Sequence, residues 1–266
     1  MRKHNYIKIL LVIMLFTLMS AAVYAEETAQ GTIGTTQTAG STQTKQTEGT
    51  NKTRKKTEAK KRTVFVAAGH QKKGISSTER YAPGKSGRKA KLTSGCDGVR
   101  THIPEYKTNL AIAKATRDEL EKRGYKVIML RTTNNCPLSN KQRTLKANKS
   151  GADIHICIHC DYYGSSSSGP HICIPRDGRY MGKSVYKKSV RLGKLVLSSA
   201  AKAVKKKSNG TISSNYYTTI NWAKIPTFIL ECGYLSNPKE DKQLNSKSYQ
   251  KKLAKGIANG VDKYFK

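Results

Sequence analysis

The hydrophobic pattern of the chain changes at about Thr63. From there to Lys266, short apolar runs that predict buried strands alternate with segments whose apolar residues recur every three or four positions and predict helices. The expected strands cover residues 64–69, 125–131, 153–160, 170–175 and 226–232, and the expected helices cover residues 105–123, 139–149, 185–207 and 247–265. This alternation is typical of an α/β fold, so we expect a single domain (63–266) with a mostly parallel twisted sheet and helices on both faces.

Residues 1–25 have the pattern of a signal peptide. A basic start is followed by an apolar run from Ile9 to Met19, and small residues stand where a signal peptidase reads the chain before cleavage after Ala25. The run is short for a bilayer span, and an uncleaved N-terminal anchor is the alternative. No later segment is apolar enough for a second span. We therefore expect a secreted or cell-wall-associated protein with no membrane span after cleavage.

Residues 26–62 have a third composition, rich in Thr, Gln, Gly, Ser and Lys and free of aromatic residues. Such a segment buries too little apolar surface to offset the entropy lost on ordering. We expect it to be a disordered basic linker between the signal peptide and the folded domain.

The chain is strongly basic. It has 50 Lys and Arg against 17 Asp and Glu, a formal net charge of +33, which predicts an anionic partner. The basic residues are not interleaved with the aromatic residues that stack on bases, so we expect no nucleic-acid partner. An exported protein meets anionic wall polymers first, and we expect these to bind the basic surface and the linker. Simple solubility is the alternative reason for the charge.

The six cysteines fall into two groups. Only Cys96 and Cys136 lie in loops where a disulfide is geometrically easy, and the sequence leaves their pairing open. The other four lie in or at the ends of expected strands, where a free cysteine packs as a small hydrophobic residue. These four are Cys157, Cys160, Cys173 and Cys232.

A Gly-, Ser- and Lys-rich stretch from Gln71 to Pro104 shows no clear periodicity. We expect a long loop there. Loops of that length inside a compact domain are usually functional, and this one could cover a cleft.

Ligands bind at the carboxyl ends of the strands in open parallel sheets. That rule selects His70, His159 and Glu231, together with Glu105 at the start of the first helix. Two imidazoles and one carboxylate form the ligand set of many catalytic zinc sites, in which the fourth position is left for water. A second carboxylate can accept the proton of that water. Glu231 lies within an apolar strand, where a carboxylate must be paired, neutral or functional.

Other residues compete for these roles. His155 and His159 are four residues apart on one strand, about 13 Å at the usual rise, so they cannot share one metal ion. We expect His155, which lies deeper in the strand, to be a core residue. Glu79 is the alternative to Glu105 as a ligand, but Glu105 is better placed because it begins a helix.

Two further histidines fall in or beside loops. We expect both His102 and His171 to be surface residues without a role in the site.

Six ordered motifs carry a resemblance to a known family. From about Val64 to its C-terminus the chain resembles the zinc-dependent N-acetylmuramoyl-L-alanine amidases (amidase type 3 family). These bacterial enzymes cleave the amide that joins N-acetylmuramic acid to the L-alanine of the stem peptide. The resemblance implies an exported peptidoglycan hydrolase with one zinc ion as cofactor. The motifs are GHQ (69–71), PEYKTNLAIA (104–113), GYKVIMLR (124–131), SNKQRTLKAN (139–148), ADIHICIHC (152–160) and IPTFILECGYLSNPKED (225–241).

The resemblance also implies residue roles. His70, Glu105 and His159 match the three zinc ligands of the family. Glu231 matches its catalytic glutamate, which takes the proton from water and passes it to the leaving alanine nitrogen.

The surroundings of the site follow the family less closely. Arg143 and Asn148 fall on recurrent family positions, where they would be structural or substrate-orienting. Ala67 stands where the family has an acidic residue that would orient a histidine ligand. Cys160 and Asp161 replace a small residue and an asparagine, and Asp161 could tune the site or the choice of substrate. Neither departure removes a ligand.

Three other functions remain open at this point, one of them a basic polyanion-binding protein with an incidental metal ion. The same zinc chemistry would serve a metallopeptidase that cuts within the stem peptide. The departures from the family pattern could instead mark a domain that binds the wall without cutting it, although the presence of Glu231 argues against this.

Overall fold

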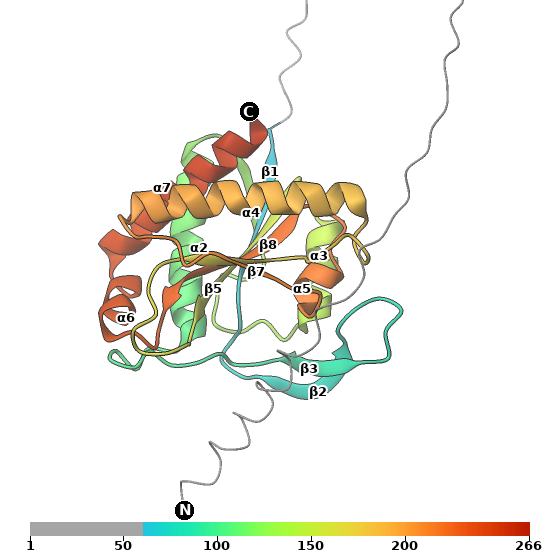
Figure 1. Cartoon of the computed structure of the whole chain (residues 1–266), viewed down its shortest axis with the longest axis horizontal. Helices are drawn as coiled ribbons and strands as arrows, with labels where there is room; N and C mark the ends of the chain where they lie inside the picture. The colour runs from blue at the N-terminus through green and yellow to red at the C-terminus, as the bar shows by residue number, and fades with distance from the viewer. Residues whose placement is uncertain (1–60) are drawn as a thin grey trace, which may run out of the picture. The chain divides into compact units, whose positions relative to one another are not determined.

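The computed structural model describes residues 61–266. A six-stranded sheet runs through this part of the chain, and a separate two-stranded sheet lies beside it (Figure 1). The expected signal peptide (1–25) and nearly all of the expected linker (26–62) lie outside the described residues, so both stay predictions.

The strand order of the large sheet is β4-β1-β5-β8-β6-β7. The first four strands are parallel, β6 is antiparallel to β8, and β7 is parallel to β6, which confirms the expected mostly parallel sheet. The strands are β1 (Thr63–Ala68), β4 (Lys126–Met129), β5 (Ile154–Asp161), β6 (His171–Ile174), β7 (Thr211–Ser213) and β8 (Thr227–Tyr234).

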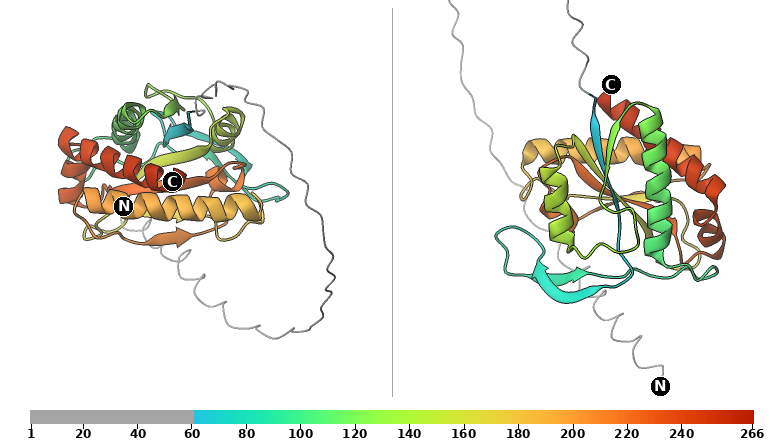
Figure 2. Two further views of the ribbon diagram at one scale, coloured as in Figure 1. Left: turned by 90° about the horizontal axis from the view of Figure 1, so that it is seen from above. Right: turned by 180° about the vertical axis from the view of Figure 1, so that it is seen from behind.

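Helices cover both faces of this sheet, as expected. On one face α2 and α4 pack on the strands, and α7 packs on those two helices; α3 and α5 lie on the other face (Figure 2). No helix among residues 61–266 is long and apolar enough to cross a membrane. The helices are α2 (Glu105–Lys122), α3 (Asn140–Lys149), α4 (Lys183–Ala203), α5 (Thr218–Asn221), α6 (Pro238–Leu244) and α7 (Lys247–Phe265).

Strand β1 shows why the apolar runs form this core. All six of its residues are buried. Val64 and Val66 face the cluster under α2, α4 and α7, whereas Phe65 and Ala67 face the cluster under α3 and α5. A parallel strand with both faces covered therefore reads as a continuous apolar run rather than an alternating one.

Helix α3 begins with a capping box. The Ser139 hydroxyl accepts a hydrogen bond from the Gln142 backbone N–H (3.1 Å), and the Gln142 side chain accepts one from the Ser139 N–H (2.8 Å). Both N–H groups would otherwise lack a helical partner, which explains why the helix starts here.

The stretch expected to be a long loop contains a hairpin instead. Strands β2 (Ile75–Arg80) and β3 (Arg88–Leu92) pair in antiparallel fashion within it. Most side chains of this hairpin are exposed or half-buried, so they give no core-facing alternation that the sequence pattern could reveal. The indole N–H of Trp222 donates to the Arg80 carbonyl (3.1 Å), which fastens the hairpin to the segment after α5.

No disulfide joins Cys96 and Cys136, and all six cysteines are free thiols. The Cys96 thiol donates to the Glu105 carboxylate (3.6 Å), whereas Cys136 packs in the core cluster on the α3 side of the sheet. The position of the two cysteines in loops did not predict a disulfide, because the two loops lie on opposite sides of the sheet. The four strand cysteines are buried, as expected.

Candidate metal centre

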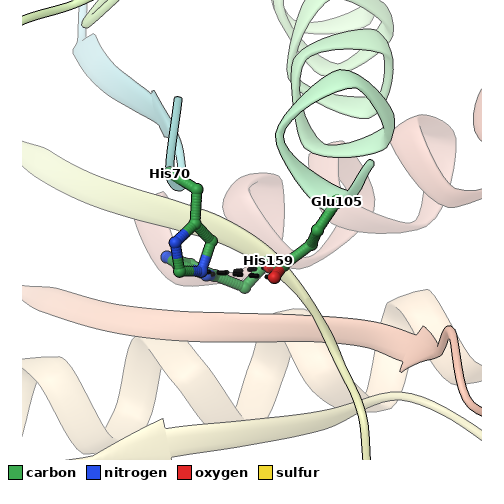
Figure 3. A group of neighbouring side chains, drawn as sticks. All are labelled: His70, Glu105 and His159. Atoms are coloured by element: carbon green, nitrogen blue, oxygen red, sulfur yellow. Dashed lines mark hydrogen bonds and ion pairs between the residues drawn. The ribbon is translucent and has the colours of Figure 1, made fainter. Parts of the chain in front are cut away.

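Three side chains converge at the carboxyl edge of the sheet. Each of His70, Glu105 and His159 offers one ligand atom, and these atoms all lie within 4.8 Å of one another (Figure 3). His70 follows the end of β1, Glu105 is the first residue of α2, and His159 lies in β5, the strand beside β1. The fold thus assembles the three residues that the sequence placed at strand and helix ends.

Glu105 bridges the two imidazoles. One carboxylate oxygen, Oε2, lies 3.2 Å from His70 Nε2, and the other, Oε1, lies 3.2 Å from His159 Nδ1. Oε1 also accepts hydrogen bonds from the Asn109 side chain (2.9 Å) and the Cys160 N–H (3.2 Å). Burial alone would raise the pKa of Glu105, but its hydrogen bond with His159 and the charges of the two histidines outweigh burial and lower the pKa to about 2.

The backbone orients His70. Its Nδ1 lies 2.7 Å from the Thr93 carbonyl oxygen, so the ring donates from Nδ1 and presents the lone pair of Nε2 to the site. Burial, and then the charge of His159, lower the pKa of His70 to about 4, which keeps the ring neutral as a ligand requires. The Thr93 carbonyl supplies the partner that the alanine at position 67 does not.

Gly69 lets the two histidine rings approach. A Cβ atom at this position would overlap the ring of His159, so any larger residue would displace that ring. The Gly69 N–H donates to the Ile158 carbonyl (2.8 Å), which continues the β1–β5 pairing up to the site. His70, the next residue, has a φ of 55° and turns back over the edge of the sheet.

Glu231 lies in β8, directly opposite His159 of β5 in the strand register. Its Oε2 has no hydrogen-bond partner within the described part of the chain. Burial raises its pKa to about 8; the charges of Glu105 and Asp161 add to this rise, and that of His159 opposes it. A carboxyl group whose pKa lies near neutrality can both accept and return a proton.

The sequence profile described as N-acetylmuramoyl-L-alanine amidase matches residues 64–263.

The chain belongs to this amidase family.

Individual relatives agree with the assignment. The protein YqiI of Bacillus subtilis, itself uncharacterized, is 28% identical over 161 residues, which cover 60% of this chain and 74% of YqiI. The N-acetylmuramoyl-L-alanine amidase AmiC of Neisseria meningitidis is 26% identical over 200 residues, covering 61% of this chain and 47% of AmiC. The chain thus spans about half the length of AmiC.

A solved structure shares the fold. The crystal structure of the N-acetylmuramyl-L-alanine amidase Ami1 from Mycobacterium smegmatis has a TM-score of 0.68 at 21% identity, and the match covers 76% of this chain and 96% of that one.

Beside the candidate metal centre lies a buried histidine that the sequence did not reveal. His171 was expected at the surface, but only 1% of it is exposed. It stands opposite Glu231 in the β6–β8 register, its Nδ1 lies 3.2 Å from the Tyr234 hydroxyl, and its Nε2 lies 3.3 Å from Asp161 Oδ2. The signal for burial was the apolar run that His171 begins. Asp161 is thus held by His171 near Glu231.

The other residues that the sequence offered for the metal centre make different contacts. Glu79 caps helix α3, accepting from the Ser139 hydroxyl and from the Lys141 N–H (2.9 Å), so it is not available to a metal ion in the site. His155 is a core residue, as expected, with its ring edge-on to Phe65. His102 is exposed, also as expected.

The side chains of Arg143 and Asn148 form hydrogen bonds with backbone groups. Arg143 is buried and donates to three carbonyl oxygens, including that of His70 (3.1 Å). Asn148 donates to the Trp222 carbonyl (2.9 Å) and accepts from the Lys224 N–H (2.8 Å). Of the two roles that family position allows, these contacts favour the structural one.

Proposed function

We propose that this protein is an exported peptidoglycan hydrolase that cleaves the amide between N-acetylmuramic acid and the L-alanine of the stem peptide. One observation carries the proposal. Three side chains of the metal-ligand type converge at the carboxyl edge of the sheet. Glu231 lies on the adjacent strand, and its buried Oε2 has no hydrogen-bond partner within residues 61–266. Family membership supports the choice of bond.

The three side chains fit a zinc ion. Zinc in proteins is tetrahedral, with bonds of about 2.0–2.2 Å, so its ligand atoms lie roughly 3.3–3.6 Å apart. The two separations from Glu105 to the histidine nitrogens are 3.2 Å each, close to that range. Three protein ligands leave one position of the tetrahedron for solvent or substrate. When bound, zinc would supply a Lewis acid that polarises the substrate carbonyl and acidifies a water molecule.

Glu231 is the proton carrier in this proposal. It would accept a proton from the attacking water and return it to the nitrogen of the departing alanine. Accepting the proton from water requires the ionised carboxylate of Glu231, which the positive charge of His159 favours. Returning it to the alanine nitrogen requires the protonated form, which burial favours. Glu105 cannot take this role, because both its oxygens are engaged by the histidines and its pKa is lowered to about 2.

The setting follows from the substrate. Peptidoglycan lies outside the cytoplasmic membrane, and the expected signal peptide (1–25) would deliver the protein there. We propose that the mature protein is secreted or stays with the wall, with peptidoglycan and anionic wall polymers as its partners.

The test is hydrolysis of purified muropeptides by the zinc-loaded protein, followed by mass spectrometry. We expect free stem peptides that begin with alanine, and we expect a chelator to abolish their release. Glu231→Gln should keep its zinc and lose at least about a thousand-fold in turnover, because it removes the proton carrier but not a ligand.

Two results would contradict the proposal. Cleavage within the stem, with the first alanine still attached to the sugar, would identify a metallopeptidase. Zinc binding without any product would identify a wall-binding domain, since the loaded site would then be inert.

A further inference from the structure

Helices α4 and α7 pack unusually closely on the outer side of the domain. A Cβ atom at Gly256 would lie 2.7 Å from the Ala200 backbone, and one at Gly260 would overlap the backbone of Val196. Glycines four residues apart on α7 therefore let the two backbones touch. The side chains that flank this contact project outward from both helices.

These flanking side chains line a basic groove, defined here by Lys202 of α4, by Lys252, Lys255 and Lys263 of α7, and by Lys266, which directly follows α7. The volume of the groove is about 670 Å³. All five lysines are exposed.

The positive charge of the basic groove is not compensated. Within residues 61–266, none of the five lysines forms an ion pair. The acidic residue of the groove, Asp262, is already engaged, because it accepts from the Arg123 guanidinium (2.7 Å) and the Tyr125 hydroxyl (2.8 Å). Five ammonium groups thus share one concave surface, where their fields add.

The lysines of α7 form a row. Steps of three and four residues along Lys252, Lys255, Asn259, Lys263 and Lys266 keep these side chains on one stripe of the helix. Neighbours at such spacing lie about 5–6 Å apart, and the stripe is about 21 Å long at the usual helical rise. A row of positive charges, interrupted once at the uncharged Asn259, suits a linear polymer with a repeating negative charge.

We propose that the basic groove binds a linear phosphodiester polymer of the cell envelope. A nucleic acid is disfavoured because no aromatic side chain of the described domain lines the groove to stack on bases. A membrane surface is disfavoured because insertion needs exposed apolar side chains. Within residues 61–266 the exposed large hydrophobic residues lie elsewhere: Val99, Tyr162, Tyr163, Ile212 and Tyr216.

The groove is remote from the metal centre. Its far end, at Lys266, adjoins Phe265, and the Phe265 ring stacks under the guanidinium of Arg62 just before β1 begins. Figure 1 accordingly shows the C-terminus beside the start of β1. The metal centre lies past the other end of β1, so a polymer held in the groove leaves the catalytic edge of the sheet open. The polymer would tether the enzyme to the wall while the site works.

The test compares two variants of the full chain that lose the same charge. In the groove variant, Lys202, Lys252, Lys255, Lys263 and Lys266 are changed to Gln. In the control variant, Lys183, Lys187, Lys188, Lys242 and Lys247, which are exposed but outside the groove, are changed to Gln. Binding of fluorescent poly(glycerol phosphate) is titrated at low and moderate salt.

We expect the groove variant to lose at least about ten-fold in affinity and much of its salt dependence, because fewer phosphates are neutralised. The control variant should lose at most about three-fold. Hydrolysis of small soluble muropeptides should be equal in both, so a failure of this proposal would not be confused with a failure of the proposed amidase activity.

Three outcomes would overturn the proposal. Equal losses in both variants would mean that net charge alone drives binding. Equal binding of poly-glutamate would mean that the groove does not select phosphate. A selective loss of binding to vesicles with anionic lipids, with polymer binding unchanged, would assign the groove to a membrane surface.

Discussion

The carboxyl edge of the sheet and the basic groove hold charge in opposite ways. At the carboxyl edge the charged groups are few, buried or half-buried, and matched: Glu105 contacts both histidines at 3.2 Å. In the basic groove the five lysines are exposed and form no ion pairs within the described domain, and the acidic residue of the groove, Asp262, is already paired with Arg123. The two regions lie at opposite ends of β1.

This difference teaches which kind of function each region can support. Buried groups interact strongly and at fixed geometry, so displacing one atom should affect chemistry greatly. Exposed groups are screened by salt and each contributes little, so they should act together and additively. We therefore expect chemistry at the edge of the sheet and adhesion in the groove.

The largest effect on ligand binding should come from Gly69→Ala. The added methyl group would push the His159 ring out of position, and we expect zinc affinity to fall about 100-fold, as when a ligand loses its support. Competition with a chromogenic chelator measures this loss. Gly84→Ala, at the hairpin turn, is the control. Its φ of 69° makes the substitution destabilising, but the added methyl group contacts no other residue, so zinc affinity should stay unchanged. Normal zinc binding by Gly69→Ala would show that the site tolerates displacement of the His159 ring. The contrast between the carboxyl edge and the basic groove would then fail.

A smaller effect should appear in the stability of the metal-free protein. Burial raises the pKa of Glu231 from 4.5 to about 8. The pKa of Glu231 is higher in the folded than in the unfolded protein. Its contribution to the free energy of unfolding is therefore fully present below pH 4.5 and is lost as the pH rises through 8. Glu231→Gln should therefore raise the melting temperature of the chelated protein, by little at pH 5 and by on the order of 5 °C at pH 8.

The control for this experiment is Glu121→Gln, an exposed position on α2. Its melting temperature relative to the unaltered protein should not change between pH 5 and pH 8. If Glu231→Gln behaved in the same way, burial would not raise the pKa of Glu231, and its part in the contrast between the two regions would fail.

The smallest effect should come from a single groove substitution. Lys252→Gln should weaken binding of poly(glycerol phosphate) only about two- to three-fold, because one exposed charge contributes little. Fluorescence anisotropy would measure the change. A loss of affinity as large as that of the groove variant, which carries five substitutions, would reveal one dominant contact. The groove would then resemble the carboxyl edge instead of differing from it.

Much of the fold was predictable because the core strands and long helices carry strong patterns. The apolar runs located β1, β5 and β8, and Ser139 marked the start of α3. The short elements β7, α5 and α6 and the β2–β3 hairpin were not predicted. They bury too few side chains in any periodic way, and packing against neighbours defines them.

By itself the sequence determined the chemistry available to this protein. The strand rise separated His155 from His159, and the positions at strand and helix ends selected His70, Glu105, His159 and Glu231, because residue type and period are local properties. Only the tertiary structure decided what holds those residues. The backbone carbonyl of Thr93, directly after β3, orients His70, and the buried His171 contacts Asp161. The tertiary structure also places the two loop cysteines, Cys96 and Cys136, in separate layers. Such contacts join segments far apart in the chain, so no local pattern records them.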